Sequence, residues 1–192
     1  MLKIAVFASG EGTNLQALID ACGSGGLHGR VTAVISNNSN AYALAKAASS
    51  GIAGYHISGK THPEKGALDG KLLKILRENE ANLIVLAGYM KILPPEIIKK
   101  YRNRIINIHP ALLPKFGGKG MFGLNVHKAV IEAGEKLSGA TVHFVDEIYD
   151  HGAILIQRTV PVLPADTPET LAARILEVEH RILPEAAGIF SC

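Results

Sequence analysis

The sequence is poor in cysteine and in aromatic residues, and these shortages exclude several classes of protein. Its 192 residues contain two cysteines, Cys22 and Cys192, at opposite ends of the chain. Two cysteines placed in this way form neither a disulfide framework nor a paired-cysteine metal site, and they favour a reducing compartment. Tryptophan is absent and aromatic residues make up 5% of the chain, so we expect no stacking platform for single-stranded nucleic acid.

Long apolar runs are missing as well. The longest runs, such as residues 84–87, fall far short of the roughly 20 apolar residues that a membrane-spanning helix needs. The apolar stretch at the N-terminus is short and leads into a glycine-rich turn, which is not the pattern of a secretory signal. We therefore expect a cytoplasmic protein without membrane contacts.

Charge is modest and of mixed sign. The chain has 20 lysines and arginines against 17 aspartates and glutamates, and its net charge is +3. This small basic excess is scattered, so it is compatible with a small anionic molecule but does not argue for a nucleic-acid partner. The eight histidines include no HExxH pair and no close cluster with cysteine, so we expect no metal site.

The chain does contain a regular alternation of strand-like and helix-like segments. Its length favours one domain with a single core. Apolar, β-branched runs alternate with segments whose apolar residues recur at helical spacing, and this pattern predicts parallel βαβ units. The expected strands are residues 2–8, 31–36, 52–57, 82–86 and 104–108, and the expected helices are residues 15–22, 41–48, 68–79 and 94–101.

The pattern changes after residue 137. Two strand-like runs, 139–145 and 153–160, are joined by a short polar segment, which predicts an antiparallel hairpin added to the sheet. A closing helix is expected over 167–187, capped by Asp166 or Thr167, with Pro184 kinking or shortening its end. The predicted fold is therefore a single-domain α/β protein, with an open, mostly parallel twisted sheet, helices on both faces and an antiparallel hairpin in the C-terminal half.

The loop Ser9–Asn14 is the first candidate site, because it joins a strand to a helix through two glycines. Such a loop gathers backbone N–H groups at a helix N-terminus and leaves room for phosphate oxygens, while Thr13 and Asn14 add a hydroxyl and an amide. Leu15 stands where the dinucleotide-binding GxGxxG motif has its third glycine, so a single phosphate fits better than a dinucleotide. The alternative is a tight turn without a ligand.

A second candidate site lies at the end of an expected strand. Asn107 and His109 are two residues apart, so their side chains point to the same side, at the edge of the sheet where such folds bind ligands. An amide beside an imidazole suits an acyl oxygen that acquires negative charge. Asp150 lies in an acidic turn, and its carboxylate could orient His109 and hold its charged form. The alternatives are a His-Pro turn and a solvated acidic turn.

Two further segments leave their interpretation open. Residues 114–125 (PKFGGKGMFGLN) are rich in glycine and are not expected to form a regular element. They suit either a mobile lid over an active site or a disordered surface loop. In the closing helix, either Glu179 or His180 could face a ligand, whereas an exposed helix face is the simpler interpretation.

Taken together, these segments resemble the phosphoribosylglycinamide formyltransferases, which are folate-dependent enzymes of purine synthesis. The resemblance covers almost the whole chain, and it depends on several short motifs in a fixed order. These are residues 9–16 (SGEGTNLQ), 86–93 (LAGYMKIL), 106–114 (INIHPALLP), the VHFVDE…D-x-G segment and the E-H-x-I-x-P segment within 142–184.

The resemblance implies roles for particular residues. Asn107, His109 and Asp150 would be the catalytic residues. The phosphate of a ribonucleotide would lie on Gly12, Thr13 and Asn14, with Glu179 on its ribose hydroxyls. The folate site would be lined by Met90, Lys91, Ile92 and Leu93. Residues 1–110 would form a nucleotide-binding half and residues 111–192 a catalytic and folate half.

Three positions depart from the family pattern. Lys91 stands where many relatives carry arginine, and lysine keeps the charge but loses the planar fork. Ala111 lacks the hydroxyl of the serine that is often found there, and His151 replaces a common glycine or threonine.

The resemblance implies transfer of a formyl group from 10-formyltetrahydrofolate to the amine of glycinamide ribonucleotide. Asn107 and a charged His109 would stabilise the oxyanion, supported by Asp150. The expected partners are small-molecule substrates, and the protein would be a monomer or a homodimer. The alternatives are another folate-dependent formyltransferase, such as methionyl-tRNA formyltransferase with its additional C-terminal domain, or a non-catalytic folate- or nucleotide-binding protein on the same fold.

Overall fold

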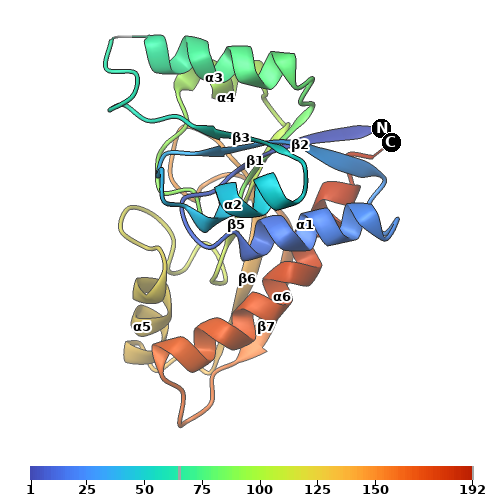
Figure 1. Cartoon of the computed structure of the whole chain (residues 1–192). Helices are drawn as coiled ribbons and strands as arrows, with labels where there is room; N and C mark the ends of the chain where they lie inside the picture. Colours follow the sequence, from blue (N-terminus) through green and yellow to red (C-terminus); the bar gives the residue numbers. More distant parts are fainter. Residues whose placement is uncertain (65, 192) are drawn as a thin grey trace.

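The strands form one mixed sheet, in the order β3-β2-β1-β4-β5-β6-β7 (Figure 1). The computed structural model describes residues 1–64 and 66–191, so Cys192 lies outside the described residues. The strands are β1 (Leu2–Phe7), β2 (Gly29–Ser36), β3 (Ala53–His56), β4 (Leu83–Leu86), β5 (Ile105–His109), β6 (Leu137–Phe144) and β7 (Ile154–Pro161).

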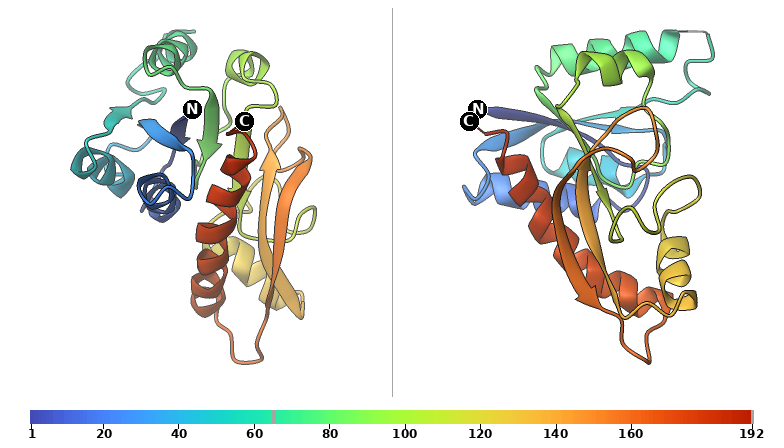
Figure 2. Two further views of the ribbon diagram at one scale, coloured as in Figure 1. Left: turned by 90° about the vertical axis from the view of Figure 1, so that its right-hand side faces the viewer. Right: turned by 180° about the vertical axis from the view of Figure 1, so that it is seen from behind.

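Helices cover both faces of the sheet (Figures 1 and 2). One face carries α3 and α4, and the other carries α1, α2 and α6, with α5 packed beside α6. The helices are α1 (Thr13–Gly23), α2 (Tyr42–Ser49), α3 (Ala67–Glu78), α4 (Pro95–Lys100), α5 (Leu124–Glu132) and α6 (Pro168–Gly188). None of these helices, which lie in the described part of the chain, is long and apolar enough to cross a membrane.

The strand pairing confirms the fold class that the sequence predicts. Strands β1 to β5 pair in parallel, and β6 and β7 add to β5 as antiparallel strands. The parallel strands have apolar residues on both faces because helices cover both of them. In β1, Ile4 and Val6 join the core beneath α1 and α6, whereas Ala5 and Phe7 join the core beneath α3.

One helix was missed by the sequence prediction. Residues 114–125 were not expected to form a regular element, but α5 begins at Leu124 and continues to Glu132. Gly123 immediately precedes the helix, and Val126 and Val130 are buried one turn apart on it. This helical spacing was present in the sequence, and the glycine-rich run before it obscured where the loop ends.

Pro184 was expected to kink or shorten the end of the closing helix, and the structure contradicts the shortening. Helix α6 passes through Pro184 and ends at Gly188. A proline inside a helix removes one backbone hydrogen bond and crowds the preceding turn. On both sides of it, Ile182, Leu183, Ala186 and Ala187 are buried in the core, and this packing holds the last turns together. At the other end Thr167 caps the helix, since its side chain accepts a hydrogen bond from the Thr170 N–H.

The sheet topology brings the candidate site residues to one edge. The strand order reverses between β1 and β4, and ligands of such sheets bind outside the carboxyl ends of the strands at this point. The loop after β1 carries the glycine-rich turn, the loop after β4 carries Met90 to Leu93, and β5 ends at His109. All three therefore open on the same edge.

The turn between β6 and β7 also reaches this edge, and Gly152 allows the chain to pass close to the end of β6 as it enters β7. A Cβ at Gly152 would overlap the backbone carbonyl of Phe144, so only glycine lets the two strands close at this point. The turn that this closure creates carries Asp150, whose φ of 53° is in the left-handed region that aspartate tolerates better than most residues.

We predict that Gly152→Ala destabilises the protein by about 1–3 kcal/mol, because the added methyl group forces the two strands apart. Urea unfolding measures this change. Gly70→Ala is the matched control: Gly70 is an exposed position within α3 whose Cβ would meet nothing, so alanine should stabilise the helix by up to about 1 kcal/mol. Equal changes in the free energy of unfolding for the two substitutions would contradict the close approach of Gly152 to the Phe144 carbonyl.

Candidate active site

One cavity of about 880 Å³ opens at the carboxyl edge of the sheet. Every residue that the sequence assigns to the site lines it, and these residues come from both halves of the chain. They are Gly12, Thr13, Asn14, Met90, Lys91, Ile92, Leu93, Asn107, His109, Asp150 and Glu179. Residues far apart in the sequence thus share one concave surface large enough for drug-sized ligands.

Hydrogen bonds from Ser9 fix the glycine-rich loop at one end of the cavity. The Ser9 N–H donates to the Gly88 carbonyl at 3.1 Å, and the Ser9 Oγ accepts from the Met90 N–H at 2.9 Å. The loops after β1 and β4 are therefore tied together at their bases. Gly12 then turns into α1 with φ 67°, where a Cβ would lie 2.8 Å from the Ala43 Cα.

The first turn of α1 leaves backbone donors available. Gly12 is its N-cap, and no side chain caps the helix. A helix start has N–H groups without partners inside the helix, and together with the helix dipole they attract an anion. Because Gly12, Thr13 and Asn14 line the cavity, this helix start can bind a phosphate group there.

Glu179 lies beside the same helix start. The residue is 7% exposed, and its carboxyl group accepts a hydrogen bond of 2.6 Å from the Asn14 Nδ2. Burial raises the pKa of Glu179 to about 7, against the opposing effect of the Asn14 hydrogen bond. The side-chain oxygen of Asn14 is buried and has no hydrogen-bond partner within the described protein, so this pair retains capacity for a polar ligand.

The other end of the cavity is apolar at its mouth. Met90 and Ile92 are exposed there, as are Ile148 and Tyr149 from the turn before Asp150. Leu93 also lines the cavity, but it is buried in the core beneath α3 and α4. Exposed apolar side chains that gather at the mouth of a cavity often mark a ligand-binding surface, and together these suit a flat aromatic ligand.

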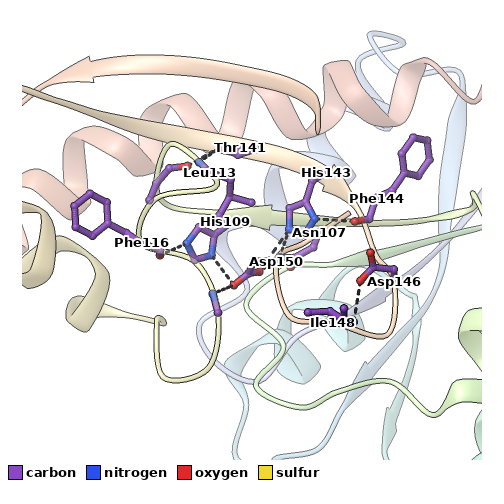
Figure 3. A network of polar contacts seen from close by, with 12 residues as sticks. Asn107, His109, Leu113, Phe116, Thr141, His143, Phe144, Asp146, Ile148 and Asp150 are labelled. Carbon is purple, nitrogen blue, oxygen red and sulfur yellow. Dashed lines mark hydrogen bonds and ion pairs between the residues drawn. The ribbon is translucent and has the colours of Figure 1, made fainter. Parts of the chain in front are cut away.

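Between these two ends, His109 and Asp150 lie close together (Figure 3). The His109 Nδ1 is 3.7 Å from the Asp150 Oδ2, and both side chains are almost buried. The loop after β5 contacts both residues. The His109 Nε2 donates to the Phe116 carbonyl at 2.8 Å, and the Gly118 N–H donates to the Asp150 Oδ2 at 2.8 Å.

Asn107 joins this group through a residue that the sequence reasoning did not identify. The Asn107 Nδ2 is 3.0 Å from the His143 Nε2 and 3.3 Å from the Asp150 Oδ1. Those two acceptor atoms are 3.5 Å apart, so they subtend a smaller angle at Nδ2 than the two N–H bonds of a planar amide do. One N–H of Asn107 can therefore serve both acceptors, in which arrangement the other N–H points to a ligand.

Burial controls the charge of this centre. It lowers the pKa of His109 more than the opposing effects of Asp150 and the Phe116 carbonyl raise it. The lowered pKa favours the neutral ring, and with Nε2 protonated its Nδ1 then carries a lone pair. For Asp150, burial alone would raise its pKa, but the adjacent His143 ring, the charge of His109 when protonated and the Gly118 N–H together bring the pKa below its usual value.

The sequence offered little indication of His143 and Gly118. His143 lies in a strand-like run as one of eight histidines, and only the pairing of β6 with β5 sets it opposite Asn107. Gly118 contributes a backbone N–H, which has no side-chain signature. Among residues 1–64 and 66–191, no group of three or more histidine, cysteine, aspartate or glutamate side chains is placed to hold a metal ion.

Comparison with known proteins places this geometry in a family. The model of the formyl transferase family matches residues 2–187. The chain belongs to the formyl transferase family. The motif resemblance found in the sequence is thereby confirmed, and the cavity of this formyl transferase family member is its candidate active site.

Two relatives that are both named phosphoribosylglycinamide formyltransferase match nearly the whole chain. A protein of Vigna unguiculata named phosphoribosylglycinamide formyltransferase, chloroplastic, is 46% identical over 95% of this chain. The phosphoribosylglycinamide formyltransferase of Haemophilus influenzae is 44% identical over 96% of this chain and 84% of its own length. The chain spans 59% of the length of the plant relative.

A solved structure shares the fold. The structure named glycinamide ribonucleotide transformylase 1 from Symbiobacterium toebii has a TM-score of 0.92 and 43% sequence identity, and the match covers all of this chain and 88% of that one. The mixed sheet with its antiparallel β5-β6-β7 portion is thus the fold of that protein as well.

We predict that Glu179→Gln changes how stability depends on pH. A carboxyl group whose pKa is raised on folding stabilises the fold at low pH, and it loses that contribution as the pH rises through the folded pKa. For Glu179 this window runs from about pH 4.5 to about 7. The stability of the glutamine variant relative to the original should therefore increase by up to about 3 kcal/mol across the window.

Urea unfolding at a series of pH values measures the difference. Glu177→Gln, an exposed position on the same helix, is the control and should show a constant difference from the original protein. A pH-independent difference for Glu179→Gln would rule out a buried carboxyl that titrates near neutrality.

Proposed function

We propose that this protein transfers the formyl group of 10-formyltetrahydrofolate to the primary amine of glycinamide ribonucleotide. The observation that carries the proposal is the position of Asn107, His109 and Asp150. They lie in one cavity, between a helix start suited to a phosphate and a mouth suited to a flat aromatic ligand. The names of the most similar relatives support the same substrates.

The nucleotide would bind at the α1 end of the cavity. Its phosphate would accept hydrogen bonds from the backbone of Gly12, Thr13 and Asn14, where the helix dipole also favours negative charge. Glu179 would hold the ribose hydroxyls, for which a buried carboxyl group with free acceptor capacity is suited. This arrangement points the glycinamide amine toward the polar centre.

The folate would bind at the apolar end. Met90 and Ile92 would pack against its rings, while Leu93, which is buried behind them, would support the wall of the cavity. The side chain of Lys91 is exposed, so it would meet the anionic part of the folate at the cavity mouth. The formyl group would then lie near Asn107.

Attack of the amine on the formyl carbon places negative charge on the formyl oxygen. In this mechanism one N–H of Asn107 serves its two protein acceptors and the other would be the donor for this oxygen. A fixed donor of this kind is typically worth about 3–4 kcal/mol of barrier, because it needs no rearrangement as the charge develops.

His109 would act in its neutral form, which differs from the charged donor that the sequence analysis expected. With Nε2–H held by the Phe116 carbonyl, the Nδ1 lone pair can take the proton that the amine loses. The positive charge that appears on the ring is then stabilised by Asp150 at 3.7 Å and by the Phe116 carbonyl. The same proton can pass from Nδ1 to the departing folate nitrogen.

Several expectations from the sequence stay predictions. They include the division into a nucleotide half and a catalytic half, the monomeric or homodimeric state, the cytoplasmic location and the absence of nucleic-acid partners. The cavity itself draws on both halves of the chain. One named relative is chloroplastic, so location can differ among relatives.

We predict that Asn107→Ala lowers kcat by about 10²-fold or more while KM for both substrates changes little, because the lost donor acts on charge that develops in the transition state. A formyl-transfer assay with both substrates measures this. Asn79→Ala, at the end of α3 far from the cavity, is the control and should leave kcat unchanged. Tight binding of both ligands without turnover by the original protein would instead indicate a binding protein.

We predict that Asp150→Asn lowers kcat by about 10²-fold or more and leaves stability almost unchanged. Asparagine tolerates the positive φ at this position and can still accept the Gly118 N–H, so the fold is retained. What it lacks is the charge that stabilises protonated His109. Steady-state kinetics and urea unfolding together check this, and full activity in the variant would remove Asp150 from the mechanism.

A further inference from the structure

His143 is among the most buried polar residues of the described chain, at 2% exposure, and the steps above give it no role. Its Nδ1 lies 2.7 Å from the Phe144 carbonyl. A carbonyl only accepts, so Nδ1 carries a proton in this contact. In the neutral ring, Nε2 is then a lone pair without a proton. The backbone of β6 thus selects one tautomer of His143.

The selected tautomer has a consequence for Asn107. The Nε2 lone pair faces the Asn107 side chain at 3.0 Å, and a lone pair stabilises the amide nitrogen there and repels the amide oxygen. The nearby Asp150 Oδ1 also accepts only, so it favours the same orientation of the amide. Without these two acceptors, a 180° rotation of the amide would present its oxygen where the formyl oxygen needs a donor.

We propose that His143 is a positioning residue that keeps the Asn107 amide turned with a free N–H toward the reacting carbonyl. This inference depends on the proposed function, since it acts through the oxyanion contact of Asn107. The Nδ1 of His143 donates a hydrogen bond to the Phe144 carbonyl, and its Nε2 contacts the Asn107 amide (Figure 3). The N–H of Asn107 that faces the ligand follows from these two contacts.

Charge on His143 would reverse this arrangement. If both ring nitrogens carried protons, Nε2 would become a donor to Asp150 at 3.5 Å and would favour the oxygen of Asn107. The titratable groups that face the ring are His109 on β5 and Asp150 and Asp146 in the turn after β6.

Two substitutions of His143, by glutamine and by asparagine, test the proposal because the two amide side chains differ in length. In His143→Gln the longer side chain can place its amide oxygen near the position of Nε2, where it accepts from Asn107. In His143→Asn the shorter side chain can still satisfy the Phe144 carbonyl but ends before Asn107. We expect kcat of the asparagine variant to fall by about tenfold or more, with KM for both substrates within about threefold, and the glutamine variant to retain most of the activity.

A double-mutant cycle separates positioning from a general structural effect. If His143 acts through Asn107, then Asn107→Ala combined with His143→Asn should be as slow as Asn107→Ala alone, within about twofold. If the loss of kcat in the double variant equals the product of the losses in the two single variants, the proposal is overturned. Equal activity of the glutamine and asparagine variants, whether both are fast or both are slow, would overturn it as well.

The controls keep a failure of this proposal distinct from a failure of the proposed function. Absence of formyl transfer by the original protein would refute the function itself. If the original protein is active and Asn107→Ala is slow, the results for the His143 variants test only the positioning role and not the proposed function. Ser138→Ala, another buried polar position on β6, should leave kcat unchanged, and affinity for glycinamide ribonucleotide shows that each variant is folded.

Discussion

The antiparallel pairing of β5 with β6 is the constraint on which the site depends. Its register sets Asn107 opposite His143 and His109 opposite Thr141. Side chains directly opposite each other in a sheet are close enough for contact, and a slip of one residue would turn them to the other face. In the same register, the Thr141 hydroxyl donates to the Ala111 carbonyl and accepts the Leu113 N–H, which fixes the chain just after His109.

The loop after β5 completes the centre with backbone groups. The Phe116 carbonyl holds one side of His109, and the Gly118 N–H holds one oxygen of Asp150. Backbone dipoles fixed in this way need no reorganisation when charge appears, which is the main source of electrostatic catalysis in such sites. Residues 118–124 of the same segment line the cavity. This position is compatible with a mobile lid, which was one of the two interpretations of residues 114–125 that the sequence left open.

Much of the fold follows from local patterns. Apolar runs in β1 and β4 are buried on both faces, so their composition shows both that they are strands and that helices cover them. The miss at α5 and the wrong expectation at Pro184 have a common origin. In both places, a glycine or proline suggested an interruption, whereas buried residues such as Val126 and Leu183 supply packing that local preference does not show.

The sequence by itself determined the succession of strands and helices apart from α5, the residue types at the candidate site and the family, because these depend on spacing along the chain. Only the tertiary structure decided which polar atoms meet. Asn107 and Asp150 are 43 residues apart, and their contact exists because β6 and its turn fold back along β5. The lowered pKa of His109 likewise comes from the fold, since burial is produced by residues distant in sequence, and it has a larger effect on that pKa than the carboxylate of Asp150.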